Sequence, residues 1–176
     1  MKRILICTLL MAVMIGVSIA EPIRQDNMRT PETITREDPV NMDQWAGIQD
    51  NKSNVGYVMY VKSIVRGSDA VDLIKRNLSY FAYDDPEPGQ EYCIAVVYVR
   101  VLSVDNSTQR VKISYKDFEA VSSKGVVRKM RVVSTLMDDL ELITPGEGET
   151  YLTFAIDNDD SPLLLYKQSI WFDLDF

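Results

Sequence analysis

The chain has 176 residues, of which 46% are hydrophobic, so it is long enough to form one domain with a sizeable core. Its formal net charge is −7 and it contains no histidine. The negative charge repels phosphate backbones and excludes nucleic acid as an expected partner. A chain without imidazole also lacks the usual general base of nucleophilic catalysis.

The first residues have the pattern of a secretory signal peptide. Lys2 and Arg3 precede an uncharged run over residues 4–20, which ends in the small residue Ala20. This pattern predicts a signal peptide over residues 1–20 and cleavage after Ala20. An uncleaved membrane anchor is the alternative, but a run of this length is at the lower limit for spanning a bilayer. We therefore expect no stable membrane span after cleavage.

The two cysteines lie on either side of the predicted cut. Cys7 would leave with the signal peptide, so the mature chain would keep only Cys93 and could form no intrachain disulfide. Cys7 also lies too deep in the apolar run to become a lipid-modified first residue. We expect a secreted or cell-envelope protein without a lipid anchor. One thiol and no imidazole offer no zinc site, so we assign no catalytic, cofactor-binding or metal residues.

Residues 21–54 have the composition of a flexible arm or linker. Prolines occur at positions 22, 31 and 39, and apolar residues show no sustained period. A polar segment of this kind buries too little surface to offset the entropy of ordering it. Trp45 is the exception, and two interpretations stay open. Its large apolar ring could dock onto the folded domain or contact a partner.

Residues 55–176 have the composition of β-strands. Segments rich in Val, Ile, Tyr and Phe are separated by turn-forming clusters such as SSKG, TPGEG and DNDDSP. This spacing predicts an antiparallel β-sandwich of about seven strands. Residues 91–101 are mostly apolar on both faces, which predicts a central strand covered on both sides. Cys93 would then point into the core and behave as a small hydrophobe.

The stretch RGSDAVDLIKRN, residues 66–77, predicts one short helix inserted after the first strand of this domain. Ser68 is a suitable N-cap, and acidic residues in the first turn with basic residues in the last turn complement the helix dipole. Val71, Ile74 and Leu78 recur at helical spacing and form an apolar stripe. We expect this stripe to lie against the sandwich.

This helix segment, the strand PEPGQEYCIAVVYVRV and the segment YKDFEAVSSKG follow one another in an order that resembles a known family. The family is a domain of unknown function in secreted bacterial proteins, sometimes mislabelled as telomeric repeat-binding factor 2. It is related to the immunoprotective extracellular antigens of actinobacteria. The resemblance covers about residues 57–155. It implies an immunoglobulin-like sandwich and an extracellular location, and it offers no catalytic residues to carry over.

Candidate interaction residues gather around an acidic loop and on one late strand. Aromatic rings beside carboxylates are typical of binding surfaces, although core packing is the alternative for each ring. Carboxylates in this loop, or in the run at 157–160, could also hold calcium or perform acid–base work, but no pattern sets their separation. The predicted interaction surface consists of Tyr80, Phe81, Tyr83, Asp84, Asp85 and Trp171.

These patterns favour a non-enzymatic binding or interaction module whose partner is another protein or a cell-envelope component. A structural envelope protein without a specific ligand is one alternative. A secreted hydrolase that uses carboxylates is the other. The lack of a histidine, and of a nucleophile with its base, favours the binding module over the hydrolase.

Overall fold

The computed structural model describes residues 27–50, 55–77, 84–103, 110–131 and 138–175. One α-helix, α1 (Gly67–Arg76), and two 3-10 turns accompany eleven strands in these ranges. The strands are β1 (Met28–Arg29), β2 (Trp45–Asp50), β3 (Val55–Arg66), β4 (Gln90–Ser103), β5 (Arg110–Ile113), β6 (Phe118–Val121), β7 (Val127–Lys129), β8 (Leu140–Ile143), β9 (Glu147–Asp157), β10 (Leu163–Tyr166) and β11 (Ile170–Asp173).

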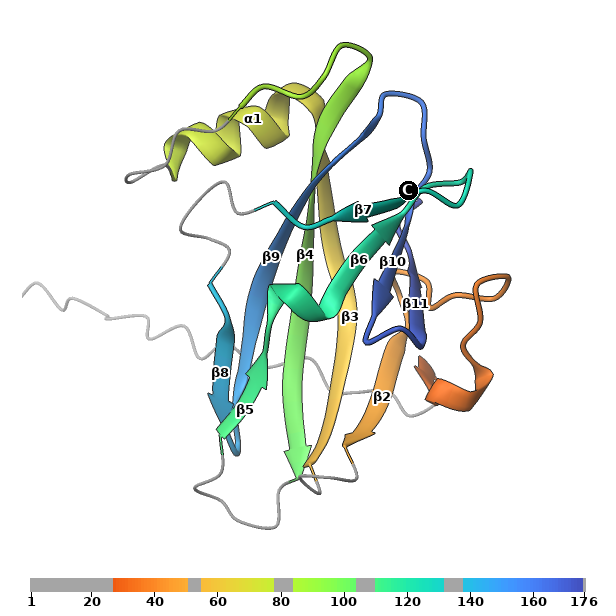
Figure 1. The fold of residues 1–176 in the computed structure, drawn as a ribbon. Coiled ribbons are helices and arrows are strands. Elements are labelled where there is room, and N and C mark those ends of the chain that lie inside the picture. The colour runs from red at the N-terminus through yellow and green to blue at the C-terminus, as the bar shows by residue number, and fades with distance from the viewer. Residues whose placement is uncertain (1–26, 51–54, 78–83, 104–109, 132–137, 176) are drawn as a thin grey trace, which may run out of the picture.

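The strands form two main sheets and a small third one (Figure 1). The first sheet has the order β1-β2-β3-β4-β9, the second has the order β11-β10-β6-β7, and β5 pairs with β8. All pairs are antiparallel except β1 with β2. The predicted immunoglobulin-like antiparallel β-sandwich is confirmed. The strand count exceeds the expected seven because short strands such as β7 pair locally and because β1 and β2 come from the expected arm.

The sandwich core lies between the two main sheets. Alternate side chains of β4, from Cys93 to Val101, point into it and meet Phe154 of β9 and residues of the second sheet such as Phe118 and Phe172. Burial raises the pKa of the Cys93 thiol to about 12, so it stays protonated at neutral pH. The core-facing direction predicted for Cys93 is confirmed.

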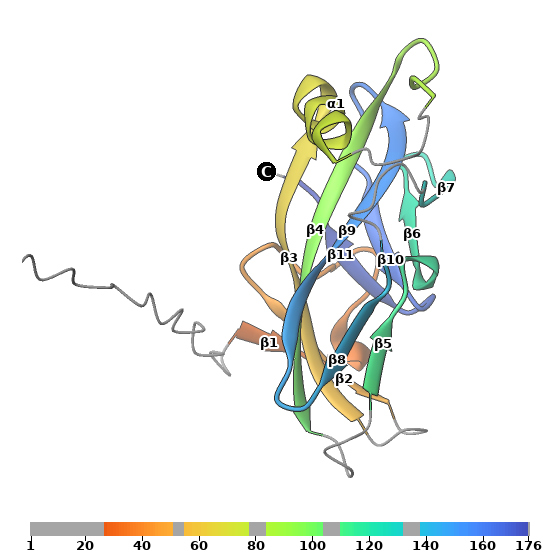
Figure 2. The same ribbon diagram turned by 90° about the vertical axis from the view of Figure 1, so that its left-hand side faces the viewer.

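The outer face of β4 is covered by α1, which lies across one end of the first sheet (Figure 2). Ala70 and Ile74 of the helix are buried against Ile94 of β4 and Ala155 of β9. This packing confirms the doubly covered strand. Of the predicted stripe, Ile74 is buried and Val71 is partly buried, whereas Leu78 lies outside the described residues. The helix follows β3, which is the first strand of the expected domain and the third of the chain.

The start of α1 differs from the prediction. The helix begins at Gly67, which has a φ of 60°, and its N-cap is Arg66, whose side chain makes no capping hydrogen bond. Arg66 instead donates two hydrogen bonds to Glu91 Oε1, at 2.9 Å and 2.7 Å. Ser68 therefore does not cap the helix. The positive φ at Gly67 lets the chain leave β3 and turn into the helix, a conformation that favours glycine.

The expected flexible arm is wrong for residues 28–50, which belong to the sandwich. β2 pairs along β3, and Ile34, Val40 and Ala46 are buried in the core. The Val40 N–H donates to the Trp171 carbonyl at 2.9 Å, and the Val40 carbonyl accepts from the Asp173 N–H at 2.9 Å. Isolated apolar side chains attach this segment to the core, and isolated side chains leave no periodic pattern in a sequence.

Arg29 gives the same segment a polar cross-link. Its guanidinium donates to Asp38 at 2.7 Å and 3.0 Å, to the Pro39 carbonyl at 3.1 Å and to the Thr33 carbonyl at 2.5 Å. The hydrogen bond from Arg29 holds the pKa of the Asp38 carboxyl below its usual value. These bonds link residues 29, 33, 38 and 39 into a defined loop.

Trp45 packs on the outer face of the first sheet. Its ring centroid lies 4.3 Å from that of Tyr60 and 5.8 Å from that of Tyr98, and the rings are tilted or edge-on. Tilted and edge-on arrangements are the favoured geometry of packed aromatic rings. Of the two interpretations of Trp45, the structure therefore supports docking onto the domain.

The predicted signal peptide, residues 1–20, lies outside the described residues. Within the part of the chain that the structure describes, no helix is both long and apolar enough to cross a membrane.

Candidate ligand-binding site

The structure places three of the six predicted interaction residues. Asp84 and Asp85 are exposed neighbours in the segment that leads into β4, where the Asp84 carbonyl accepts a hydrogen bond from the Tyr92 hydroxyl. Trp171 lies on β11 in the other main sheet, half-buried against the core, with the Arg36 guanidinium 5.9 Å from its ring centroid. Tyr80, Phe81 and Tyr83 lie outside the described residues. The described candidates therefore belong to two separate elements.

Two carboxylates of the run at 157–160, those of Asp157 and Asp160, have structural partners. Asp160 is 8% exposed, and its Oδ1 accepts from the Ser123 N–H at 2.9 Å and from the Ser123 hydroxyl at 2.6 Å. These bonds tie the β9–β10 connection to the β6–β7 turn. No group of three His, Cys, Asp or Glu side chains that could hold a metal ion occurs among the described residues. The turn interpretation of this run is the one that the contacts support.

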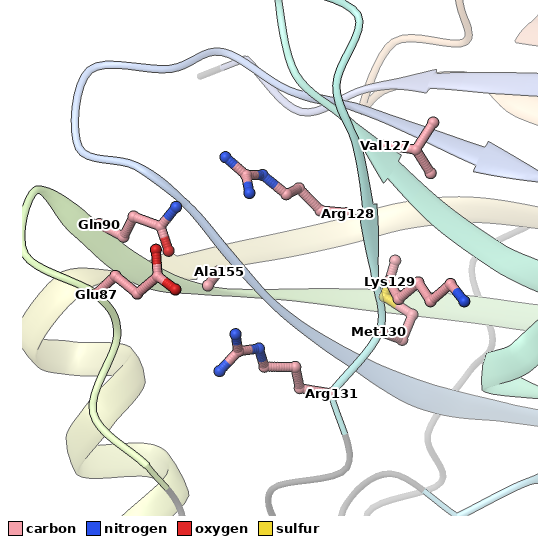
Figure 3. A pocket seen from close by; sticks show the side chains of 8 residues that line it. All are labelled: Glu87, Gln90, Val127, Arg128, Lys129, Met130, Arg131 and Ala155. Carbon is pink, nitrogen blue, oxygen red and sulfur yellow. The ribbon is translucent and has the colours of Figure 1, made fainter.

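A pocket of about 280 Å³ opens beside β7, between the loop that leads into β4 and the chain that follows β7 (Figure 3). We call it the arginine pocket. Its lining consists of Glu87, Gln90, Val127, Arg128, Lys129, Met130, Arg131 and Ala155.

The chain at 127–131 forms one wall because it crosses from one main sheet to the other. β7 pairs with β6, with Arg128 opposite Ala120, and the Arg131 N–H then donates to the Thr153 carbonyl of β9 at 2.6 Å. Leaving the strand geometry after Lys129 removes the strict alternation of side chains. Arg128 and Arg131 consequently point the same way, toward Glu87 and Gln90, while Lys129 points away (Figure 3).

Arg128 is only partly satisfied by the protein. Its Nη2 lies 3.5 Å from Asp157 Oδ1, an atom that also accepts from Gln90 Nε2 at 3.3 Å. Its Nε atom is buried and has no hydrogen-bond partner. A buried donor without an acceptor costs free energy, so the protein alone does not satisfy this guanidinium fully.

The side chains of Arg131 and Glu87 make fewer polar contacts than that of Arg128. No hydrogen bond or ion pair joins either side chain to another residue in the ranges that the structure describes. Both residues are exposed at the pocket and lie on its opposite walls. The arrangement can therefore bind a small charged group through charge-assisted hydrogen bonds.

A second hollow of about 530 Å³ lies between the edge of β2 and the β10–β11 turn, where residues such as Ile48, Tyr57, Tyr166 and Ile170 line it. The hydroxyl groups of Tyr57 and Tyr166 are 3.0 Å apart and bond to each other, and burial raises the pKa of Tyr166. This hollow is larger than the arginine pocket, but its two most buried polar groups are already paired.

Comparison with known proteins defines the fold but no family. No family model matches the sequence, and no curated protein matches it significantly. The secreted protein MPT63 of Mycobacterium tuberculosis is similar in structure, with a TM-score of 0.51 and 10% identity over 77% of this chain and 97% of that one. YcdA of Bacillus subtilis, assigned as a lipoprotein, has a TM-score of 0.49 and 13% identity over 68% of this chain. This chain spans 36% of the length of YcdA.

The likeness to MPT63 supports the class that the strands define, a small immunoglobulin-like β-sandwich protein. It agrees with the fold implied by the family resemblance, whereas membership of that family stays a prediction.

Sequence reasoning missed the arginine pocket. The stretch VVRKMRVV was grouped with the strands because valines flank it. The available signal was the cluster of three basic residues, Arg128, Lys129 and Arg131, within four positions of an acidic chain. Such a cluster indicates a candidate anion-binding surface.

Proposed function

We propose that the protein is an extracellular, non-enzymatic binding module that recognises an anionic group in the arginine pocket. The signal-peptide pattern of residues 1–20 supports the location, as does the structural likeness to a protein described as secreted. The expected partner is a protein or a cell-envelope component that presents a carboxylate or a phosphate.

One observation carries the proposal: two guanidinium groups point into one cavity and keep donors that the protein does not use. The Arg128 Nε atom is buried without an acceptor, and Arg131 has no side-chain partner among the described residues. A ligand oxygen in the pocket would bond to the Arg131 guanidinium beside that of Arg128 through charge-assisted bonds, which are about twice as strong as neutral ones. Guanidinium groups also match the planar geometry of a carboxylate.

The two alternative functions fit the pocket less well. A hydrolase that uses carboxylates needs a pair at a defined separation, and Glu87 is the single carboxylate of the lining. A structural protein without a ligand does not need two arginine side chains that point into one pocket. The immunoglobulin-like fold itself tolerates many functions and does not decide between them.

Acetate and inorganic phosphate are the probes for this proposal. Titration of the purified protein, followed by NMR chemical shifts, should give saturable binding with a Kd on the order of 1 mM, equivalent to about −4 kcal/mol. Arg131→Ala should weaken binding of both anions about tenfold, because a charge-assisted hydrogen bond contributes about 1.5 to 3 kcal/mol.

Arg110→Ala is the matched control, since Arg110 lies on β5 at the other end of the sandwich and pairs with Glu141 at 3.0 Å (Figure 1). This variant should bind as the unmodified protein does. The proposal is wrong if neither anion binds saturably, or if the two arginine variants behave alike while thermal midpoints show that both are folded.

A further inference from the structure

We infer that the arginine pocket selects a dipolar ligand, one that carries a carboxylate close to an ammonium group. A free amino acid has this chemistry, and so does an amino-acid unit at the end of a larger chain. The inference rests on the proposed function and adds a second charge requirement to it.

The first reason is that opposite charges face one another inside the pocket. Arg128 and Arg131 point into it, whereas Lys129 points away (Figure 3). Glu87 faces the two arginines from the opposite wall, and Asp157 lies 3.5 Å from Arg128. Glu87 is the single carboxylate of the lining, so the pocket presents positive and negative groups on opposite walls. A site with separated charges of both signs suits a ligand that carries separated charges of both signs.

The second reason is the position of Glu87. Its loop is anchored, because the Gln90 N–H donates to the Glu87 carbonyl at 2.9 Å and the Asn158 N–H donates to the Gly89 carbonyl at 3.1 Å. These bonds hold the Glu87 backbone beside the pocket, and no described residue bonds to its carboxylate. A plain anion beside Arg131 would meet repulsion from Glu87. An ammonium group on the same ligand would replace that repulsion with a charge-assisted hydrogen bond.

The third reason is that the same carboxylates disfavour phosphate. A phosphate monoester carries close to two negative charges at neutral pH. Glu87 and Asp157 would both repel it, whereas a carboxylate carries one charge and presents two coplanar oxygens to a guanidinium. The pocket volume of about 280 Å³ is close to the lower end for small-molecule sites, which agrees with a compact ligand.

Alanine and propionate form the test pair, because they differ only by the ammonium group. NMR titration should show alanine binding at least tenfold more tightly than propionate. Alanine methyl ester, which lacks the free carboxylate, should bind no better than propionate. Inorganic phosphate at pH 7.5 should bind more weakly than alanine.

Two variants separate the groups of the pocket. Glu87→Gln should lower the affinity for alanine to that for propionate, because the ammonium group loses its partner. The same variant should not weaken the binding of propionate. Arg131→Ala should weaken both ligands. Glu37→Gln, which changes an exposed carboxylate outside the pocket lining, is the control and should change neither affinity. Thermal midpoints should confirm that all variants fold.

The outcomes distinguish this inference from the proposed function. If propionate binds as tightly as alanine, or if Glu87→Gln keeps the difference between them, the dipolar ligand is wrong while anion binding stands. If no carboxylate or phosphate probe binds saturably, both the dipolar ligand and the proposed anion binding are wrong.

Discussion

Helix α1 and the N-terminal segment 27–50 both pack against the sandwich, yet they do so by different means. The helix lays a periodic apolar stripe, centred on Ala70 and Ile74, across the outer face of the first sheet. The N-terminal segment adds a strand at the sheet edge and inserts Ile34, Val40 and Ala46 singly into the core. Both coverings bury apolar surface, but only the helix has a local pattern.

A segment can therefore bury side chains in the core without a periodic apolar pattern in its sequence. A helix must repeat its buried side chains every three or four residues, because its backbone turns at a constant rate. An irregular segment can bury one residue wherever its path meets the core, and its neighbours stay polar. Its backbone groups are satisfied by partners elsewhere in the chain, such as β3 and β11.

The largest effect is expected from deleting residues 27–50. The deletion removes β1, β2 and the small core residue Ala46, together with Ile34 and Val40, each of which contributes about 1.5 to 3 kcal/mol when fully buried. That loss is comparable with the total stability of a typical domain, about 5 to 15 kcal/mol, so we expect no cooperative unfolding transition. Circular dichroism during heating is the measurement. A thermal midpoint lowered by only a few degrees would mean that the segment is dispensable and is not part of the core.

Ile74→Ala should destabilise the protein by about 2 to 4 kcal/mol, the usual range for truncating a buried aliphatic side chain. Ile74 is 1% exposed and packs between α1 and the first sheet. Urea denaturation at 25 °C measures the change. Val71→Ala, at a partly buried helical position, is the control and should cost less. Equal costs for the two variants would show that the stripe is not centred on Ile74.

Trp45→Ala tests whether a single anchor stabilises the N-terminal segment. The half-buried ring stacks with Tyr60 and Tyr98, so we expect a loss of about 2 kcal/mol, below the 3 to 5 kcal/mol of a fully buried aromatic residue. The same urea experiment measures it, and Trp45→Phe should recover much of the loss. An unchanged stability of Trp45→Ala would leave the ring free for a partner, the interpretation that the packing disfavours.

Asp72→Ala should have the smallest effect, under about 1 kcal/mol, because exposed polar pairs on a helix contribute a few tenths. Asp72 is exposed, and the Arg76 Nε atom donates to its backbone carbonyl at 3.2 Å, a bond that the substitution keeps. A loss above 2 kcal/mol would show that the outer face of α1 carries a contact that its exposure does not reveal.

Features that depend on local periodicity are predictable from the amino-acid sequence. Apolar residues on both faces of residues 91–101 predict a strand covered on both sides, and helical spacing predicts α1. The core-facing direction of Cys93 follows from its position on one of these faces. Each of these depends on neighbours within a few positions, where backbone geometry dictates which side chains share a face. The signal peptide was read from a local pattern as well and stays a prediction.

Tertiary structure alone decided the features that join distant segments. Val40 belongs to the segment that the sequence predicts to be a flexible arm, yet its backbone pairs with β11 and its side chain is buried in the core. The arginine pocket brings Glu87 and Gln90, just before and at the start of β4, to Arg128 and Arg131, about forty residues later in the chain. They meet because the chain after β7 crosses from the second sheet to β9 of the first. No local pattern records that crossing, since side-chain directions after β7 depend on where the chain meets β9 and not on its own period.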